Sequence, residues 1–98
     1  MYYVYVIRNE EGRTYTGYTG DLRRRMEEHN HGRNRSTKSH SWKLIYYEAF
    51  RSSSDARRRE RRLKRSHQAR RWLRERISDS LEMIGEAECR KSFELKPQ

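Results

Sequence analysis

An aromatic segment followed by a turn constrains the fold of this chain most strongly. Residues 2–8 are tyrosines and branched side chains that end in one arginine, a composition typical of a β-strand. Residues 9–12 supply asparagine and glycine for a turn, and residues 14–18 again carry tyrosine and threonine. The pattern therefore predicts a β-hairpin. Because side chains alternate along a strand, Tyr5 shares a face with Tyr3 and Ile7.

The rest of the chain favours helices around one more strand. Thr19-Gly-Asp is typical of a helix cap, and it predicts a helix over 22–30 that Gly32 ends. Residues 43–48 predict a third strand, and Ser52-Ser-Ser-Asp caps a helix that runs to Arg65. A last helix is expected over 68–78, where the apolar residues Ala69, Trp72, Leu73 and Ile77 recur at helical spacing. The predicted order is ββαβαα, an α+β fold.

Charge limits the function classes. The 98 residues carry 24 Lys+Arg against 14 Asp+Glu, a formal net charge of +10. Such an excess favours nucleic acid as the partner over a basic surface that serves solubility alone. No apolar run approaches the roughly 20 residues that span a bilayer, and the start of the chain lacks a signal-peptide core. We expect no membrane partner and a cytoplasmic protein.

Length and composition predict one small domain over residues 1–79. Only 32% of the residues are hydrophobic, so the core should be modest. Residues 80–98 are expected to form a C-terminal tail that is partly helical or disordered, with a short helical turn around Leu81, Met83 and Ile84. Cys89 is the single cysteine of the sequence, so no internal disulfide can form.

Helical spacing brings two charged residues onto apolar faces. In the first predicted helix, Arg25 and His29 share a face with Leu22 and Met26. An arginine there must reach solvent at the edge or pair with an anion. In the second, Glu60 lies on the stripe of Ala56 and Leu63, where an ion pair with a neighbouring arginine is the simpler interpretation.

The tyrosines also allow two interpretations. Core packing with a solvated hydroxyl is their usual fate. If Tyr5 and Tyr15 instead converge beside Arg25, His29 and Glu60, the set supplies what phosphodiester hydrolysis requires. A hydroxyl or an imidazole orients or deprotonates water, a guanidinium stabilises the phosphate, and a carboxylate holds a divalent cation.

In this arrangement the chain resembles the GIY-YIG nuclease superfamily, especially its small bacterial stand-alone members. The first motif corresponds to Tyr3-Val4-Tyr5 and the second to Tyr15-Thr16-Gly17, followed by Arg25, His29 and Glu60. The match extends over about residues 2–78. The first motif lacks its leading glycine and isoleucine, and Thr16 replaces the isoleucine of the second, but these positions carry no chemistry.

The resemblance implies a three-stranded antiparallel sheet flanked by helices and metal-dependent endonuclease activity on DNA. Tyr5 or Tyr15 would orient or activate the water, with His29 as the alternative general base, and Arg25 would hold the scissile phosphate. Glu60 would be the one protein carboxylate on Mg²⁺ or Mn²⁺, in a single site that is weak without substrate.

Basic side chains around these residues are the expected phosphate contacts. They are Arg23, Arg24, Arg33, Arg35, Lys38, Arg57, Arg58, Arg61 and Lys64. Such contacts position nucleic acid without reading its sequence. Specificity is therefore expected to come from a branch, a nick or a single strand, or from a partner protein, and RNA stays open as a substrate. Trp42 is expected in the core rather than against a base.

Two alternatives remain at this point. The chain could be an inactive nucleic-acid-binding module on the same fold. It could also hold a structural zinc through His29, His31 and His40 with Cys89, although that spacing fits no compact zinc motif.

Overall fold

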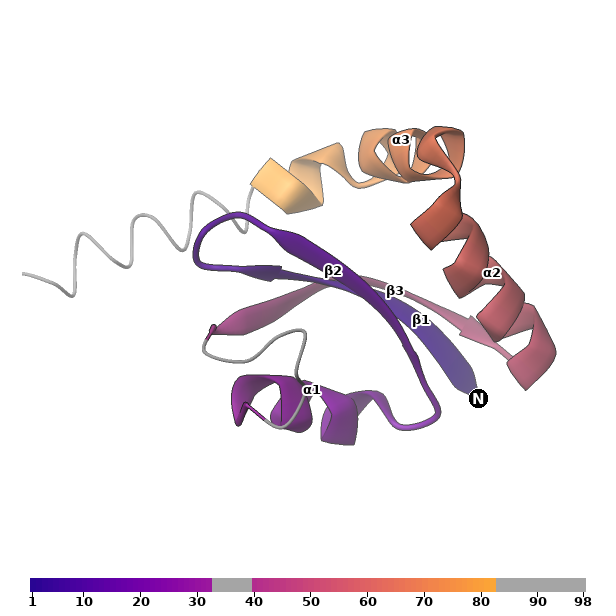
Figure 1. The fold of residues 1–98 in the computed structure, drawn as a ribbon, viewed down its shortest axis with the longest axis horizontal. Helices are drawn as coiled ribbons and strands as arrows, with labels where there is room; N and C mark the ends of the chain where they lie inside the picture. The colour runs from indigo at the N-terminus through magenta and orange to yellow at the C-terminus, as the bar shows by residue number, and fades with distance from the viewer. Residues whose placement is uncertain (33–39, 83–98) are drawn as a thin grey trace, which may run out of the picture.

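The computed structural model describes residues 1–32 and 40–82. Its elements follow the predicted ββαβαα order, and the sheet and helices make it an α+β fold (Figure 1). They are β1 (Tyr2–Asn9), β2 (Thr14–Thr19), α1 (Leu22–Asn30), β3 (Trp42–Phe50), α2 (Ser53–Arg65) and α3 (His67–Arg76). The third strand is longer at both ends than the predicted 43–48, and α3 begins and ends earlier than the predicted 68–78.

Local side-chain hydrogen bonds fix the turns and helix ends. Asn9 accepts hydrogen bonds from the backbone of Glu11 and Arg13 through Oδ1, at 3.0 and 2.9 Å, and so holds the hairpin turn. Gly12 has φ 86° in that turn, a conformation that glycine adopts without steric cost. Ser66 is both the C-cap of α2 and the N-cap of α3, so one residue joins the two helices.

The strands form an antiparallel sheet in the order β2-β1-β3, which confirms the predicted three-stranded antiparallel sheet. Tyr5 of the central strand lies opposite Gly17 on β2 and Tyr47 on β3. The register between β1 and β3 shifts between Val6 and Ile7. Strand β2 is therefore one edge of the sheet and β3 the other.

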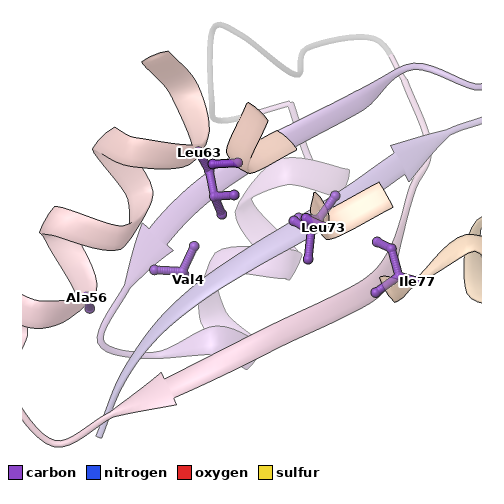
Figure 2. Packing of buried hydrophobic residues seen from close by; sticks show 7 residues of the cluster. Val4, Ala56, Leu63, Leu73 and Ile77 are labelled. Carbon is purple, nitrogen blue, oxygen red and sulfur yellow. The ribbon is translucent and has the colours of Figure 1, made fainter. Parts of the chain in front are cut away.

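Helices cover both faces of the sheet (Figure 1). On one face α2 and α3 pack on β1 through a buried cluster that includes Val4, Ala56, Leu63, Leu73 and Ile77 (Figure 2). On the other face α1 covers a second cluster, which consists of Tyr5, Ile7 and Trp42 with the partly buried Tyr15, Leu22, Met26 and Leu44 around it. The strand alternation read from the sequence is confirmed, because Tyr5 and Val4 belong to opposite clusters.

Two tryptophans have different environments. Trp42 is 5% exposed, so the expectation that it packs in the core is confirmed. Trp72 is 53% exposed, although it recurs at helical spacing with the buried Ala69, Leu73 and Ile77. It lies about 100° around the helix from Leu73, and this turn carries it past the edge of the buried stripe.

Past α3 the chain continues in helical conformation at residues 78–82, and Leu81 packs against the cluster under α2 and α3. The expected turn residues Met83 and Ile84, Cys89 and the rest of the tail lie outside the described residues. The division into 1–79 and 80–98 stays a prediction. Within the described parts, none of the helices has the length and apolar character to cross a membrane.

Candidate active site

A buried hydrogen bond between Tyr5 and His29 lies at the centre of the site. Tyr5 comes from β1 and His29 from the last turn of α1, both side chains are fully buried, and Tyr5 Oη lies 2.6 Å from His29 Nε2. Burial raises the pKa of Tyr5 to about 12, although the nearby guanidinium of Arg25 opposes the shift. The phenol is therefore protonated at neutral pH, and it donates to the imidazole in the tautomer of His29 that carries its proton on Nδ1.

The imidazole is poised as an acceptor. Burial lowers the pKa of His29, and the positive charge of Arg25 lowers it further, while Glu28 opposes both. At neutral pH the ring is therefore uncharged. An uncharged ring with Nε2 facing a phenol can accept a proton that passes through that phenol.

Arg25 is held at the rim of the same site. Its Nη1 lies 3.0 Å from Glu28 Oε1, one helical turn further along α1, and this ion pair lowers the pKa of Glu28. The Nε of Arg25 is buried, and no residue of the described chain accepts a hydrogen bond from it. Arg25 was expected either to reach solvent at the edge or to pair with an anion, and the ion pair with Glu28 is the second of these outcomes. A buried donor of this kind can take an oxygen of a bound anion.

Tyr15 of β2 and two residues of α2, Glu60 and Lys64, complete the candidate site. The ring of Tyr15 lies edge-on to His29, with centroids 5.3 Å apart. Lys64 Nζ lies 5.4 Å from the centre of the Tyr15 ring and 3.2 Å from Glu60 Oε2. Glu60 thus forms the expected ion pair, but with a lysine one turn away rather than with an arginine.

The five predicted site residues are brought together around one phenol. His29 is hydrogen bonded to Tyr5, Tyr15 packs against His29, and the charges of Arg25 and Glu60 both act on the pKa of Tyr5. They come from β1, β2, α1 and α2, so only the tertiary fold unites them. The assignment of catalytic roles to these residues stays a proposal.

Gly17 makes this convergence possible. A Cβ atom at this position would lie 2.3 Å from Tyr5 Oη and 2.4 Å from Tyr5 Cζ, far inside normal contact distance. The glycine of the second motif therefore gives the phenol room to cross β2 towards His29. Its role is steric.

Sequence reasoning missed two members of the site. Glu28 was not considered, and Lys64 was expected to contact phosphate rather than to pair with Glu60. The signal was present in the helical spacing, because Glu28 follows Arg25 by three residues and Lys64 follows Glu60 by four.

A divalent cation fits this site only with help from water and substrate. Within residues 1–32 and 40–82 no group of three or more His, Cys, Asp or Glu side chains is arranged to hold a metal. Glu60 offers one carboxylate, a ligand that Mg²⁺ and Mn²⁺ accept, and water and phosphate oxygens would complete the coordination. The zinc alternative needs the ring nitrogens of the histidines as ligands. The Nε2 atom of His29 is hydrogen bonded to Tyr5, and the Nδ1 atom of His40 is hydrogen bonded to Glu10 at 3.0 Å. Cys89 lies outside the described residues.

The expected phosphate contacts differ in their surroundings. Arg57 lies over the ring of Tyr18 at 5.1 Å, Arg23 and Arg61 are exposed, Arg24 pairs with Glu28, and Arg58 pairs with Asp55. Arg33, Arg35 and Lys38 lie outside the described residues. Next to Glu60, Arg59 makes a two-pronged ion pair with Glu48 of β3, so it is not part of a solvated arginine surface.

Comparison with known proteins identifies the domain that carries these residues. Residues 1–75 match the GIY-YIG catalytic domain. The chain belongs to the GIY-YIG family. This family is a nuclease superfamily whose substrates are nucleic acids.

Relatives of this GIY-YIG domain occur in archaea and bacteria. A UPF0213 protein of Halobacterium salinarum is 43% identical over 75 residues, which cover 70% of this chain and 92% of the relative. A UPF0213 protein of Streptococcus agalactiae is 43% identical over 60 residues, covering 59% and 68% of the two chains. A UPF0213 protein of Staphylococcus saprophyticus is 35% identical over 65 residues, covering 64% and 79%. No solved structure matches the chain significantly.

Proposed function

We propose that this protein is a divalent-metal-dependent endonuclease that hydrolyses phosphodiester bonds in DNA, with selectivity for DNA structure or weak preference for sequence. The observation that supports this best is the Tyr5–His29 hydrogen bond of 2.6 Å, with the charges of Arg25 and Glu60 acting on the same phenol. A structural tyrosine does not require a guanidinium, an imidazole and a carboxylate around it. In phosphodiester hydrolysis these groups can stabilise the phosphate charge, accept a proton and hold a divalent cation.

Arg25 would bind the scissile phosphate. Its buried Nε lacks an acceptor within the described part of the chain, and a phosphate oxygen supplies one. The guanidinium presents several donors in a planar array that matches phosphate, and it stabilises the negative charge that develops during attack. Glu28 holds the guanidinium in place until substrate arrives.

Tyr5 and His29 would remove the proton of the attacking water. As the water oxygen bonds to phosphorus, its proton passes to Tyr5 Oη while the Tyr5 proton passes to His29 Nε2. Tyr5 thus remains a phenol, and the imidazole becomes an imidazolium. The bond to the leaving oxygen breaks, and that oxygen takes a proton from solvent. Tyr15, which lies against His29, orients the water.

Glu60 would hold Mg²⁺ or Mn²⁺. When bound, the cation supplies positive charge that polarises the phosphate and lowers the pKa of bound water. The ion pair with Lys64 at 3.2 Å keeps the carboxylate neutralised in the free protein. Lys64 would have to release Glu60 before the carboxylate binds a cation, and this competition supports the proposal of a site that is weak without substrate.

Cleavage of end-labelled DNA tests the proposal. The panel comprises plasmid, single-stranded, nicked, flapped and branched DNA plus RNA, with Mg²⁺ or Mn²⁺. We expect wild type to cut and Glu60→Ala and Arg25→Ala to lose about 10²–10³-fold in rate while still binding. Glu27→Ala is the matched control, because this carboxylate is exposed on α1. Full cleavage by the Glu60 variant would refute the metal assignment.

The second candidate is an inactive nucleic-acid-binding module on the same fold. It is favoured by the ion pairs that neutralise both Arg25 and Glu60 in the free protein. It predicts binding to every member of the panel and cleavage of none, with no change on replacing Glu60. The same experiment therefore separates the two functions.

A further inference from the structure

Helix α2 follows the edge strand β2 and places basic side chains against its tyrosines. Arg57 lies over the ring of Tyr18 at 5.1 Å, near one end of the strand. Lys64, two turns further along α2, lies 5.4 Å from the ring of Tyr15, in the candidate active site. The helix and the strand therefore run in opposite directions, with positive charge at both points of contact.

Helix α3 extends this alignment past the active site. Arg70 and Arg74 line the same narrow cleft as Thr14 and Thr16 of β2. Figure 1 shows α2 and α3 following one another on one side of the sheet. The basic side chains of both helices thus border β2 from Tyr18 at one end to Thr14 at the other.

The position of α3 is fixed by its own residues. Arg70 Nη1 donates to the carbonyl oxygens of Leu63 and Lys64, at 3.0 and 2.6 Å, in the last turn of α2. A guanidinium at this end satisfies carbonyls that have no partner within the helix and opposes the helix dipole. Ser66 caps both helices at the same junction. These contacts fix the position of α3, and hence of its arginines, relative to α2 and the candidate active site.

An open hollow of about 560 Å³ lies over this surface of α3, lined by His67, Gln68, Arg70, Arg71 and Arg74. As far as the described residues extend, neither Arg71 nor Arg74 forms an ion pair with a carboxylate. By contrast, the guanidinium of Arg59 is neutralised by Glu48 on the opposite flank of α2. The hollow therefore has uncompensated positive charge and several hydrogen-bond donors, which suits phosphate groups.

We propose that Arg57, Lys64, Arg70, Arg71 and Arg74, here called the β2-edge track, bind the phosphodiester backbone of the nucleic-acid substrate on both sides of the scissile bond. This inference rests on the proposed function and extends it, because it gives α3 the role of a substrate-binding arm. A six-residue strand spans roughly 20 Å. That length corresponds to about six base pairs of duplex at a rise of 3.4 Å each.

The salt dependence of binding tests the track. Glu60→Gln is the background, so that substrate stays intact, and Arg71→Gln with Arg74→Gln removes two charges from the α3 end. The control removes two charges from the β3 side, with Arg62→Gln and Arg76→Gln. Arg62 follows Arg59 by three residues, and the charge of Arg76 acts on Tyr46 of β3. Affinity for labelled DNA and RNA duplexes of one sequence is measured by fluorescence anisotropy over a range of salt concentrations.

We plot the logarithm of the association constant against the logarithm of the salt concentration. For the α3 variant the slope of this plot should become shallower by about 1.8, because each of the two lost phosphate contacts lowers its magnitude by about 0.9. The control should keep the wild-type slope. Equal slopes in the two variants, whether changed or unchanged, would overturn the track. The DNA and RNA arms show which backbone occupies it. Cleavage is measured separately, with protein that retains Glu60. If the salt slopes contradict the track, the nuclease proposal still stands. If the protein does not cleave, the salt slopes still test the track.

Discussion

Replacing Gly17 with alanine should destabilise the domain through one contact. The new methyl carbon would lie 2.3 Å from Tyr5 Oη and 2.4 Å from Cζ, so the buried ring must move by about 1 Å or more to reach ordinary contact distance. Crowding of a packed core by one methyl typically costs about 1–3 kcal/mol. Displacing the phenol also breaks its bond to His29 and leaves a buried nitrogen unsatisfied, which costs about 1–3 kcal/mol.

Alanine restricts the unfolded chain more than glycine does, and this gain offsets about 0.4–1 kcal/mol of the loss. The net expectation is a decrease of about 1–6 kcal/mol in the free energy of unfolding. In a domain of this size, each kcal/mol shifts Tm by about 4–8 °C. Tm should therefore fall by at least about 4 °C, and by more than about 10 °C at the middle of the range.

The assay is thermal and urea unfolding followed by circular dichroism, with Gly20→Ala as the matched control. A methyl group at Gly20 would meet only ring carbons of Tyr2 at 3.8 Å, an ordinary contact. If Gly17→Ala proves too unstable to measure, Tyr5→Leu is added, since removing the ring should recover part of the loss. A Gly17 variant as stable as the Gly20 variant would refute the steric argument, and so would a double variant that recovers nothing.

Two further predictions concern the charged groups of the site. Because the folded-state pKa of His29 is lowered, the unfolded chain binds a proton more readily, and stability should decrease as pH falls below about 6.5. Urea unfolding between pH 8 and pH 5 should show this decrease, and His29→Gln should make it shallower; parallel curves would contradict the buried neutral ring. Lys64→Met should strengthen Mn²⁺ binding to the free protein about two- to fivefold, because the ion pair that competes for Glu60 is part-exposed and worth at most about 1 kcal/mol. Isothermal titration calorimetry measures this, and weaker or unchanged binding would show that Lys64 does not compete with the cation.

The sequence alone was enough to predict the elements and their faces. Alternating aromatic and branched residues predicted β1 and β2, and the helical spacing of Leu22, Met26 and His29 predicted the inner face of α1. These patterns succeed because strand and helix periods depend on neighbouring residues in the chain. Spacing alone does not separate the exposed Trp72 from the buried Leu73, because the width of the buried stripe depends on what packs against the helix.

The candidate site could be predicted only as a set of residues. Spacing singled out Arg25, His29 and Glu60 on apolar helix faces and left two interpretations of Tyr5 and Tyr15. The resemblance to known nucleases then assigned all five to one site. It did not show that Lys64 neutralises Glu60, or that Arg59 turns to β3 and pairs with Glu48. Both pairings depend on distances and directions that residue types alone do not specify.

What the sequence determined by itself is therefore the order of elements, their caps and the residues that face inward, since each of these is set by short-range backbone geometry. The tertiary structure decided that Tyr5 passes Gly17 to reach His29, and that the basic flanks of α2 and α3 border β2. Contacts between segments far apart in the chain require the sheet register and the packing of helices on it. These arise from the whole core at once rather than from any local pattern.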